Sequence, residues 1–354
     1  MKKFMRKNIA QHPAAGLLLL TVASCAAWGA EPWAPRDSSR QDDRDSPYVP
    51  ARYERTFTAN FLNPNEEFNR VDNPWFTTAN FRLNPEDLNT CRRLGANKER
   101  QLYVDQDFSY DGRKLGINPF AIKDGILSIT ALPLSGAQKE ILAPLADEKK
   151  RIPAVLYSSG MLSTETQLRK PGQGFTQLYG YWELRARLPK GKGLWPGFWL
   201  VGETHEFWDE VDIFEVLGDH PRNIYQSAHL HAGGGTDGMK WPEHTYTGID
   251  STDGFHVYGL LMTTNSLRYY VDGVQTLELA HTLKVPLYVI LNLGVGGSWG
   301  GDPDSGTVFP ASMNIDYLRI YKKRDEAGGP RVPETGLPRG RLRDGQTVLT
   351  VSRS

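Results

Sequence analysis

The sequence predicts an all-β fold, either a sandwich or a barrel. Short runs of β-branched and aromatic residues recur through the middle of the chain, and Gly, Pro, Asn and Asp separate them. The runs are GILSITA, YGYWELRARL, VDIFEVLG, NIYQSAHLHA, FHVYGLLM, SLRYYVDG, PLYVILNLGV and MNIDYLRIY. Asp-Gly pairs at Asp124-Gly125 and Asp272-Gly273 are typical of the tight turns between antiparallel strands. We therefore expect short antiparallel strands in packed sheets.

Length and composition are compatible with one large domain. The chain has 354 residues, of which 39% are hydrophobic and 11% aromatic, so it can bury a sizeable core. Lys plus Arg and Asp plus Glu both number 41, which gives a net charge of +0. This balance offers no electrostatic basis for binding nucleic acid or an anionic membrane surface. We expect a monomer.

Residues 1–30 have the layout of a secretory signal, with a basic leader, a short apolar run and small residues. The segment Val22-Ala23-Ser24-Cys25 is similar to a bacterial lipobox, whose cysteine becomes lipidated, and ordinary cleavage after Ala27 or Gly29 is the alternative. We expect export to the periplasm or the medium, with membrane attachment only if Cys25 is lipidated. Cys91 is the one other cysteine, so we expect no structural disulfide.

Composition divides the rest of the chain into a folded domain and two flanks. Residues 31–50 and 323–354 are polar, charged and Pro-containing, without a periodicity that buries a face, and we expect a tether and a flexible tail there. Residues 51–322 are the expected catalytic domain. Within it, residues 135–155 carry no motif, and we expect them to cap a cleft and narrow the choice of substrate.

The stretch WDEVDIFEVLG contains three carboxylates in an otherwise apolar run. On a β-strand Glu210 and Asp212 share one face, while Val211 and Ile213 occupy the other. Strict alternation would turn Glu215 away from the first two acids. One extra residue, inserted as a β-bulge, returns Glu215 to their face.

This acidic face is either an ordinary solvated face or a reaction site. No Lys or Arg lies between Lys192 and Arg222 to offset the three charges, which repel one another along the strand. Crowded carboxylates keep one group protonated near neutral pH, as a general acid beside a nucleophile requires. At about 3.3 Å per residue, and with the bulge absorbing one of the five steps, the Cα atoms of Glu210 and Glu215 lie roughly 13 Å apart. That separation permits the ~5–5.5 Å carboxyl spacing of retaining glycosidases, and it also permits the wider inverting spacing.

Tryptophans cluster around the acidic run. Trp195 and Trp199 precede it in LPKGKGLWPGFWLV, and Trp182, Trp208, Trp241 and Trp299 lie in neighbouring segments. A single tryptophan most often packs in the core, but a group of indoles beside carboxylates suits the flat C–H face and the hydroxyls of a sugar.

These motifs resemble glycoside hydrolase family 16, the family of laminarinases, lichenases and agarases. The Glu-x-Asp-x-x-Glu signature of the family matches Glu210, Asp212 and Glu215 in its bulged form. The matching segments, in the order of the family, are YGYWELRARLPKGKGLWPGFW, FHVYGLLM, YYVDG, PLYVILNLGVGGSWGGDPD and FPASMNIDYLRIY. The sequence also resembles secreted glycanases of bacterial exopolysaccharide systems, through the N-terminal segments NKERQLYVDQD and NPFAIKDGILSITA. It implies a β-jelly-roll sandwich of two antiparallel sheets with an open concave cleft.

The resemblance also implies residue roles. Glu210 would be the nucleophile, Asp212 would orient it, and Glu215 would act first as acid and then as base. Sugar-binding roles, each with core packing or an ordinary strand position as the alternative, are implied for Trp195, Trp199, Trp208, Trp299, His229 and Arg185. His231 shares the face of His229 with less support. Trp182 stands where relatives carry Phe, a change expected to reshape one wall of the cleft.

The expected function is that of a secreted, endo-acting, retaining β-glycanase acting on 1,3- or mixed 1,3/1,4-linked β-glucan or on a bacterial exopolysaccharide. Catalysis would need no cofactor, and the resemblance implies a structural Ca²⁺ at Asp316 on the convex face, where an ordinary carboxylate is the alternative. Three other functions remain open on this fold: a transglycosylase, an agar- or carrageenan-type galactan hydrolase, and a non-catalytic glycan-binding protein.

Overall fold

The computed structural model describes residues 45–324, with gaps at 64, 67, 70–72, 79–86, 167–172, 204–208, 232–238 and 241–242. The expected signal segment, most of the expected tether and nearly all of the expected tail lie outside the described residues, as do Trp208 and Trp241. Among the described residues, no helix is long and apolar enough to cross a membrane.

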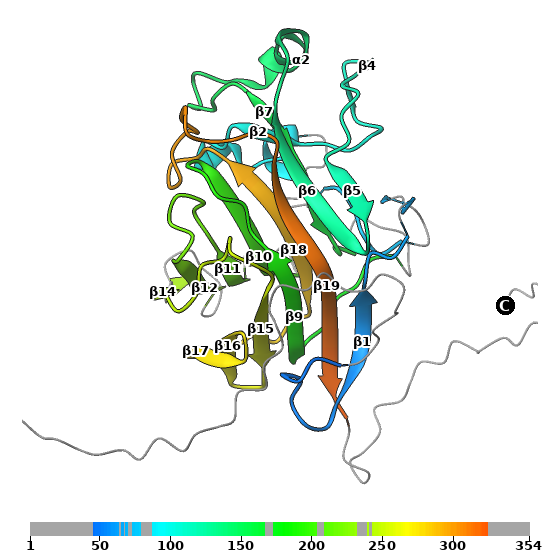
Figure 1. Ribbon diagram of the computed structural model, residues 1–354, viewed down its shortest axis with the longest axis vertical. Coiled ribbons are helices and arrows are strands. Elements are labelled where there is room, and N and C mark those ends of the chain that lie inside the picture. Colours follow the sequence, from blue (N-terminus) through cyan, green and yellow to red (C-terminus); the bar gives the residue numbers. More distant parts are fainter. Residues whose placement is uncertain are drawn as a thin grey trace, which may run out of the picture.

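Two large β-sheets dominate the described part of the chain (Figure 1). One has ten strands, which are in spatial order β17 (Val274–Ala280), β16 (Ser266–Val271), β15 (His256–Met262), β9 (Gly180–Arg187), β19 (Ala311–Lys323), β6 (Ile126–Pro133), β7 (Tyr157–Ser159) and β2 (Gln101–Tyr103), with β1 (Tyr53–Ala59) paired to β19 and β5 (Phe120–Lys123) paired to β6. The other has seven, which are β13 (Met239–Lys240), β12 (Ile224–His231), β11 (Glu210–Glu215), β10 (Leu194–Gly202), β18 (Leu287–Val295) and β8 (Met161–Ser163), with β14 (Glu243–Tyr246) paired to β12.

The remaining described elements are short. They are the ribbon β3 (Ser109–Tyr110) and β4 (Arg113–Lys114), the helices α1 (Leu88–Cys91) and α2 (Gly136–Leu142), and the 3₁₀ turns η1 (Gly95–Asn97) and η2 (Ala143–Leu145). Among the strands that the structure describes, every pair is antiparallel except the parallel pair β2–β7. The all-β, antiparallel prediction is therefore confirmed.

Both Asp-Gly turns predicted from the sequence join hairpins. Asp124 and Gly125 connect β5 to β6, and Asp272 and Gly273 connect β16 to β17. All four residues have positive φ, at 52° and 73° in the first turn and 48° and 78° in the second. Positive φ at both central positions matches the right-handed twist of the strands that such a turn joins.

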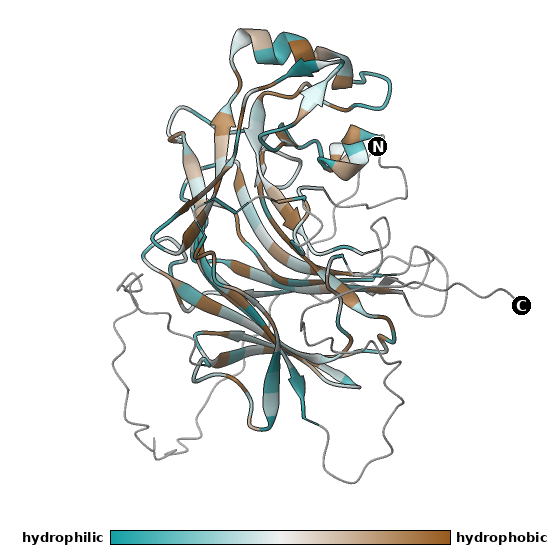
Figure 2. Ribbon diagram, turned by 90° about the vertical axis from the view of Figure 1, so that its right-hand side faces the viewer, coloured by the Kyte–Doolittle hydropathy of each residue, from teal (hydrophilic) through white to brown (hydrophobic). Residues whose placement is uncertain are grey.

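The core lies between the two sheets, and alternation along the strands builds it. In β9, Trp182, Leu184 and Ala186 are fully buried within the core cluster, whereas Glu183 and Arg185 belong to the other face of the strand. Figure 2 shows the same alternation of apolar and polar residues along many strands. The expectation that Trp182 shapes a wall of the cleft is wrong, because its ring packs between the sheets and is 0% exposed.

Residues 135–155 form a small lobe at one end of the sandwich (Figure 1). Ser135 and Gln138 form a capping box that starts α2, which η2 follows directly. The lobe shares a separate apolar cluster with β2 and the β3–β4 ribbon, made up of Leu102, Val104, Phe108, Leu115, Leu134, Leu142, Leu145 and Val155. The expected cap is thus a packed lobe with its own small core.

Candidate active site

Strand β11 carries the three predicted acids, and the predicted bulge is present. Opposite β12, Glu210 pairs with His229, Asp212 with Ser227 and Glu215 with Tyr225, with a shift of register between Asp212 and Glu215. Three steps along β11 therefore match two steps along β12, which returns Glu215 to the face of the other acids. Val211, Ile213 and Phe214 are fully buried in the core on the other side.

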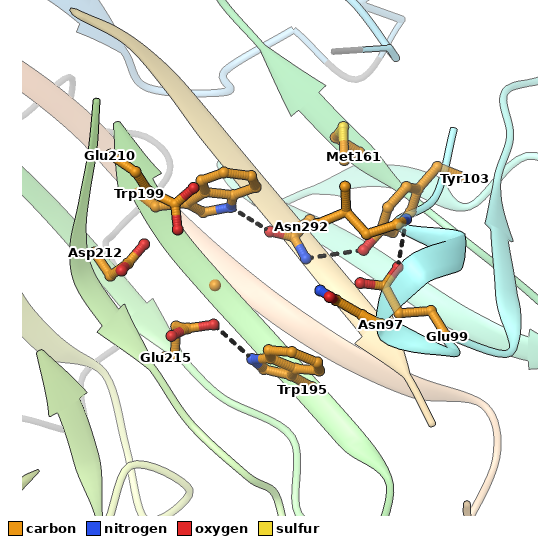
Figure 3. Close-up of a pocket in the computed structure, with 13 residues that line it drawn as sticks. Asn97, Glu99, Tyr103, Met161, Trp195, Trp199, Glu210, Asp212, Glu215 and Asn292 are labelled. Atoms are coloured by element: carbon orange, nitrogen blue, oxygen red, sulfur yellow. Dashed lines mark hydrogen bonds between the residues drawn. The ribbon is translucent and has the colours of Figure 1, made fainter. Parts of the chain in front are cut away.

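The three acids line one pocket on the seven-stranded sheet. Figure 3 shows Glu210, Asp212 and Glu215 on one side of this pocket, with Trp195 and Trp199 beside them. The fold therefore brings together, in one pocket, the three acids and the two tryptophans for which the sequence predicted a role in catalysis or sugar binding. The lining consists of Leu94, Asn97, Glu99, Tyr103, Met161, Trp195, Gly197, Trp199, Glu210, Asp212, Glu215, Asn292 and Gly294.

Asp212 sits at the centre of a hydrogen-bonded group. Its side chain is 2% exposed and accepts a hydrogen bond from Ser227 Oγ. The Nε2 atom of His229 lies 3.0 Å from Asp212 Oδ2 and 3.6 Å from Glu210 Oε1. The hydroxyl of Tyr269 donates a hydrogen bond to the backbone carbonyl of Ser227 at 2.7 Å and so helps to fix Ser227. A carboxylate in this setting is fixed in orientation beside Glu210.

The cluster of Glu210, Asp212 and His229 also has the spacing of a metal site, since one donor atom from each lies within 4.8 Å of the others. The same carboxylate and imidazole groups would also take part in catalysis by the three acids, without a metal. Catalysis without a cofactor stays a prediction.

A second hydrogen-bonded group fixes the ring of Trp199. Its Nε1 donates to Asn292 Oδ1 at 2.7 Å, and Asn292 Nδ2 donates to the hydroxyl of Tyr103 at 2.9 Å. Gly197 pairs with both Asn292 and Glu215 across its strand. A Cβ atom at Gly197 would approach Asn292 Oδ1 to 3.0 Å, so glycine leaves room for this contact in the floor of the pocket.

Trp195 joins the acids to an aromatic group. Its Nε1 donates to Glu215 Oε1 at 3.0 Å, and its ring meets Trp299 edge to face at 5.3 Å. Trp299 in turn meets Tyr225 edge to face at 4.7 Å. Trp299 is 41% exposed, an unusually open position for an indole. The group gives the Glu215 end of the pocket a partly exposed apolar surface.

Sequence reasoning did not single out Asn97, Glu99, Tyr103 and Asn292, which complete the pocket on the side opposite the acids. The first three lie in the segment NKERQLYVDQD, which carried part of the resemblance to exopolysaccharide glycanases without any assigned role. Their polar side chains gave no local signal, because the fold brings them to the acids from a distant part of the chain.

One residue predicted to bind sugar, Arg185, lies outside the pocket. Arg185 lies on β9 in the ten-stranded sheet, where its Nη1 donates to Asp316 Oδ2 at 2.6 Å and its guanidinium lies 4.9 Å from the ring centre of Phe255. It does not line the pocket, so the structure does not support a contact between Arg185 and a sugar in it. His231 lies at the end of β12, and Trp208 falls outside the described residues.

Asp316 is a poor match to a calcium ligand. Its side chain is 1% exposed, and one of its oxygens is engaged by the Arg185 guanidinium, which is itself a cation. Ca²⁺ requires six to eight oxygen ligands, and a guanidinium beside Asp316 opposes the binding of a second cation there. A calcium ion at Asp316 stays a prediction.

Comparisons with known proteins agree with this geometry. Residues 149–319 match the model of glycosyl hydrolases family 16. Two proteins of Rhizobium meliloti (strain 1021), the endo-1,3-1,4-β-glycanases ExsH and EglC, are each 30% identical over 230 residues, which cover 64% of this chain and 44% of the relative. This chain therefore matches less than half of the length of those relatives.

Solved structures show the same two-sheet jelly-roll architecture. The endo-β-1,3-glucanase from Pyrococcus furiosus has a TM-score of 0.55 and 29% identity, and the match covers 76% of this chain and 94% of that chain. The laminarinase catalytic domain of Thermotoga maritima has a TM-score of 0.55 and 26% identity, covering 76% of this chain and 98% of that chain. Together with the acids on their bulged strand, these similarities establish that the chain belongs to glycosyl hydrolases family 16.

Proposed function

We propose that this chain is an endo-acting β-glycanase that cleaves 1,3- or mixed 1,3/1,4-linked β-glucan with retention of the anomeric configuration. The observation that carries the proposal is the placement of three carboxylates on one face of β11, beside two indoles in one pocket. The names of the relatives described above support the substrate class.

In the first step Glu210 attacks the anomeric carbon of the bound sugar. Its carboxylate oxygen forms a bond to that carbon while the glycosidic C–O bond breaks, and Glu215 gives its proton to the departing oxygen. The products are a glycosyl ester on Glu210 and a shortened glycan with a new hydroxyl group. Trp195, which donates to Glu215 Oε1, holds this carboxyl in place.

In the second step water hydrolyses the glycosyl ester on Glu210. Glu215, now ionised, takes a proton from water, whose oxygen bonds to the anomeric carbon as the bond to Glu210 breaks. The two inversions restore the starting configuration, and both carboxyls return to their initial protonation states.

Asp212 acts through its neighbours. Held by Ser227 and lying close to His229, it lies on the same face of the strand as both reacting carboxyls and fixes the electrostatic environment of Glu210. We propose that Asp212 positions the nucleophile and does not itself bond to sugar.

The test uses purified protein on laminarin, lichenan, curdlan, agarose and bacterial exopolysaccharides, with proton NMR of the earliest products. We expect new reducing ends from a β-glucan, first in the β form. A first product in the α form would exclude double displacement. Cleavage of agarose alone would favour the galactan hydrolase, and accumulation of products longer than the substrate would favour the transglycosylase. Binding without new reducing ends would indicate a glycan-binding protein.

We also propose that the protein acts after export, which the leader in residues 1–30 supports. Mass spectrometry of the mature N-terminus, together with fractionation of a Cys25→Ser variant, tests the location. Release without a lipid is the expected result. A lipid on Cys25, with a shift from membrane to soluble fraction in the variant, would instead indicate an anchored enzyme.

A further inference from the structure

The pocket contains a fourth carboxyl, that of Glu99, which the mechanism above does not use. Glu99 lies between η1 and β2 and lines the same pocket as the three acids. Figure 3 shows Asn97 and Glu99 on the side of the pocket opposite Glu210, Asp212 and Glu215. Glu99 is only 4% exposed, so its carboxyl is largely withdrawn from bulk water. A buried carboxyl at the wall of a sugar pocket requires an explanation.

The carboxyl of Glu99 is fixed by hydrogen bonds on its inner side. Its Oε2 accepts from the backbone N–H of Leu94 at 3.0 Å and from Gln101 Nε2 at 2.6 Å. The backbone of Glu99 forms a bridge to Gly296, which follows β18. These contacts set one orientation of the carboxyl relative to the pocket.

Arg93 binds the backbone of the same segment. Its fully buried guanidinium donates from Nη1 to the carbonyl oxygens of Glu99 at 3.3 Å and Pro153 at 3.1 Å, and from Nη2 to that of Leu145 at 3.0 Å. Its Nε donates to Asn89 Oδ1 at 2.7 Å. Leu145 and Pro153 belong to the lobe of residues 135–155. One side chain thus ties that lobe to the backbone of Glu99.

Burial leaves the carboxyl of Glu99 close to a balance between its neutral and ionised forms near neutral pH. Burial raises the pKa of Glu99 to about 7, and the hydrogen bonds and Arg93 offset part of this effect. The other ionisable groups that line the pocket are Tyr103 on β2 and, across the pocket, Glu210, Asp212 and Glu215 on β11. The neighbouring residue Arg100 is directed to Asp302, with 3.7 Å between its Nε and Asp302 Oδ1. The neutral form donates a hydrogen bond to a ligand, and the ionised form can only accept one.

We propose that Glu99 is a substrate-binding residue that hydrogen-bonds a hydroxyl of a sugar bound beside the three acids, and that the lobe of residues 135–155 holds it in position through Arg93. The inference rests on the proposed β-glycanase function. It explains why the lobe is tied to the pocket wall although none of its residues lines the pocket. On this proposal the lobe positions a substrate-binding residue and does not cover the cleft.

The test measures binding without turnover. Calorimetry gives the Kd of laminarin-type oligosaccharides between pH 5.5 and 8.5 for Glu210→Gln, which removes the proposed nucleophile, and for the same protein carrying Glu99→Gln. Glutamine keeps the shape and the hydrogen bonds of Glu99 but cannot ionise. We expect the Kd to change severalfold across this range in the first protein, and this change to vanish in the second. Glu148→Gln, an exposed residue of the lobe, is the matched control and should leave the first profile unchanged.

Glu99→Met provides the second readout, because it removes the hydrogen bond and keeps the bulk. It should weaken binding about tenfold at the pH where the protein with Glu99 binds most tightly, the loss expected for roughly one hydrogen bond, and its own Kd should not change with pH. Arg93→Lys should weaken binding in the same direction, with folding checked by circular dichroism. Equal Kd values and parallel pH profiles with and without Glu99→Gln would overturn the inference.

The failure of the inference is distinguishable from that of the proposed function. New reducing ends released by the unmodified protein, together with unchanged binding in the Glu99 variants, would overturn this inference alone. No cleavage by the unmodified protein, together with weakened binding in the Glu99 variants, would overturn the hydrolase and retain Glu99 as a binding residue. Absence of both cleavage and binding would overturn both.

Discussion

The indole N–H of Trp195 donates a hydrogen bond to Oε1 of Glu215 at 3.0 Å. The same indole meets Trp299 edge to face, so it links the proposed acid to the aromatic group at one end of the pocket. Trp195 therefore serves two purposes, since it restricts the carboxyl and presents an aromatic ring. Trp199 is different, because its N–H is directed to Asn292 and away from the acids.

This difference predicts that two matched substitutions affect different kinetic constants. Trp195→Phe keeps an aromatic ring but removes the hydrogen bond to Glu215, and we expect kcat to fall about tenfold with a smaller change in KM. Trp199→Phe releases Asn292 and should mainly raise KM. Steady-state kinetics on a soluble β-glucan compares them. Equal kcat values for Trp195→Phe and the unmodified enzyme would show that the bond does not contribute to catalysis.

The roles assigned to the three acids predict a graded loss of activity. Glu210→Gln and Glu215→Gln should each lower kcat by at least about a hundredfold, because each group bonds to, or exchanges a proton with, the reacting atoms. Asp212→Asn should cost less, since Asp212 acts on its neighbours. Circular dichroism and melting curves check that each variant is folded. Near-normal turnover by Glu215→Gln on an unactivated polysaccharide would rule out its role as acid.

The sequence predicted the acid strand well, because the relevant information was local. Alternation placed Glu210 and Asp212 on one face, and the position of Glu215 required a bulge that the register between β11 and β12 contains. The two Asp-Gly hairpins were predictable for the same reason, since the turn residues themselves specify the backbone.

The parts that the sequence missed depend on partners far away in the chain. Arg185 looked like a candidate for sugar binding until Asp316, 131 residues further on, was found beside it. Trp182 resembled the other tryptophans of its region, but the packing of the second sheet against β9 decided that it is core. The sequence around Glu99 gave no sign of a function, because only the fold places this residue across the pocket from the three acids.

Glu99 also predicts how stability depends on pH. The pKa of its carboxyl is about 7 in the fold, raised by burial from an ordinary value of 4.5. Between these values the folded state binds more protons than the unfolded state, so the stability that this group contributes is full below pH 4.5 and is lost as the pH rises through 7. Glu99→Gln removes this dependence. Relative to the unmodified protein, it should gain on the order of 3 kcal/mol between pH 5 and pH 8.

Urea denaturation at the two pH values measures this difference. Glu148→Gln is exposed and should leave the pH dependence unchanged. Parallel stability profiles for Glu99→Gln and the unmodified protein would mean that Glu99 is ionised in the fold throughout the range.

The pair formed by Asp316 and Arg185 yields the last prediction. Asp316 is 1% exposed and lies 2.6 Å from a guanidinium that is itself 16% exposed, so removing either partner strands a charge in a poorly hydrated site. Asp316→Asn should lower the free energy of unfolding by about 3–5 kcal/mol, as expected when one half of a buried ion pair is lost. The double variant Asp316→Asn, Arg185→Met should recover a large part of that loss, because it leaves no uncompensated charge.

A chelator separates this account from a calcium site. If Asp316 stabilises the fold through Arg185, EDTA should leave the melting temperature unchanged and the double variant should remain more stable than Asp316→Asn alone. A calcium ion at Asp316 would give the reverse pattern: EDTA would lower the melting temperature of the unmodified protein, neither variant would respond to EDTA, and Arg185→Met would bring no recovery.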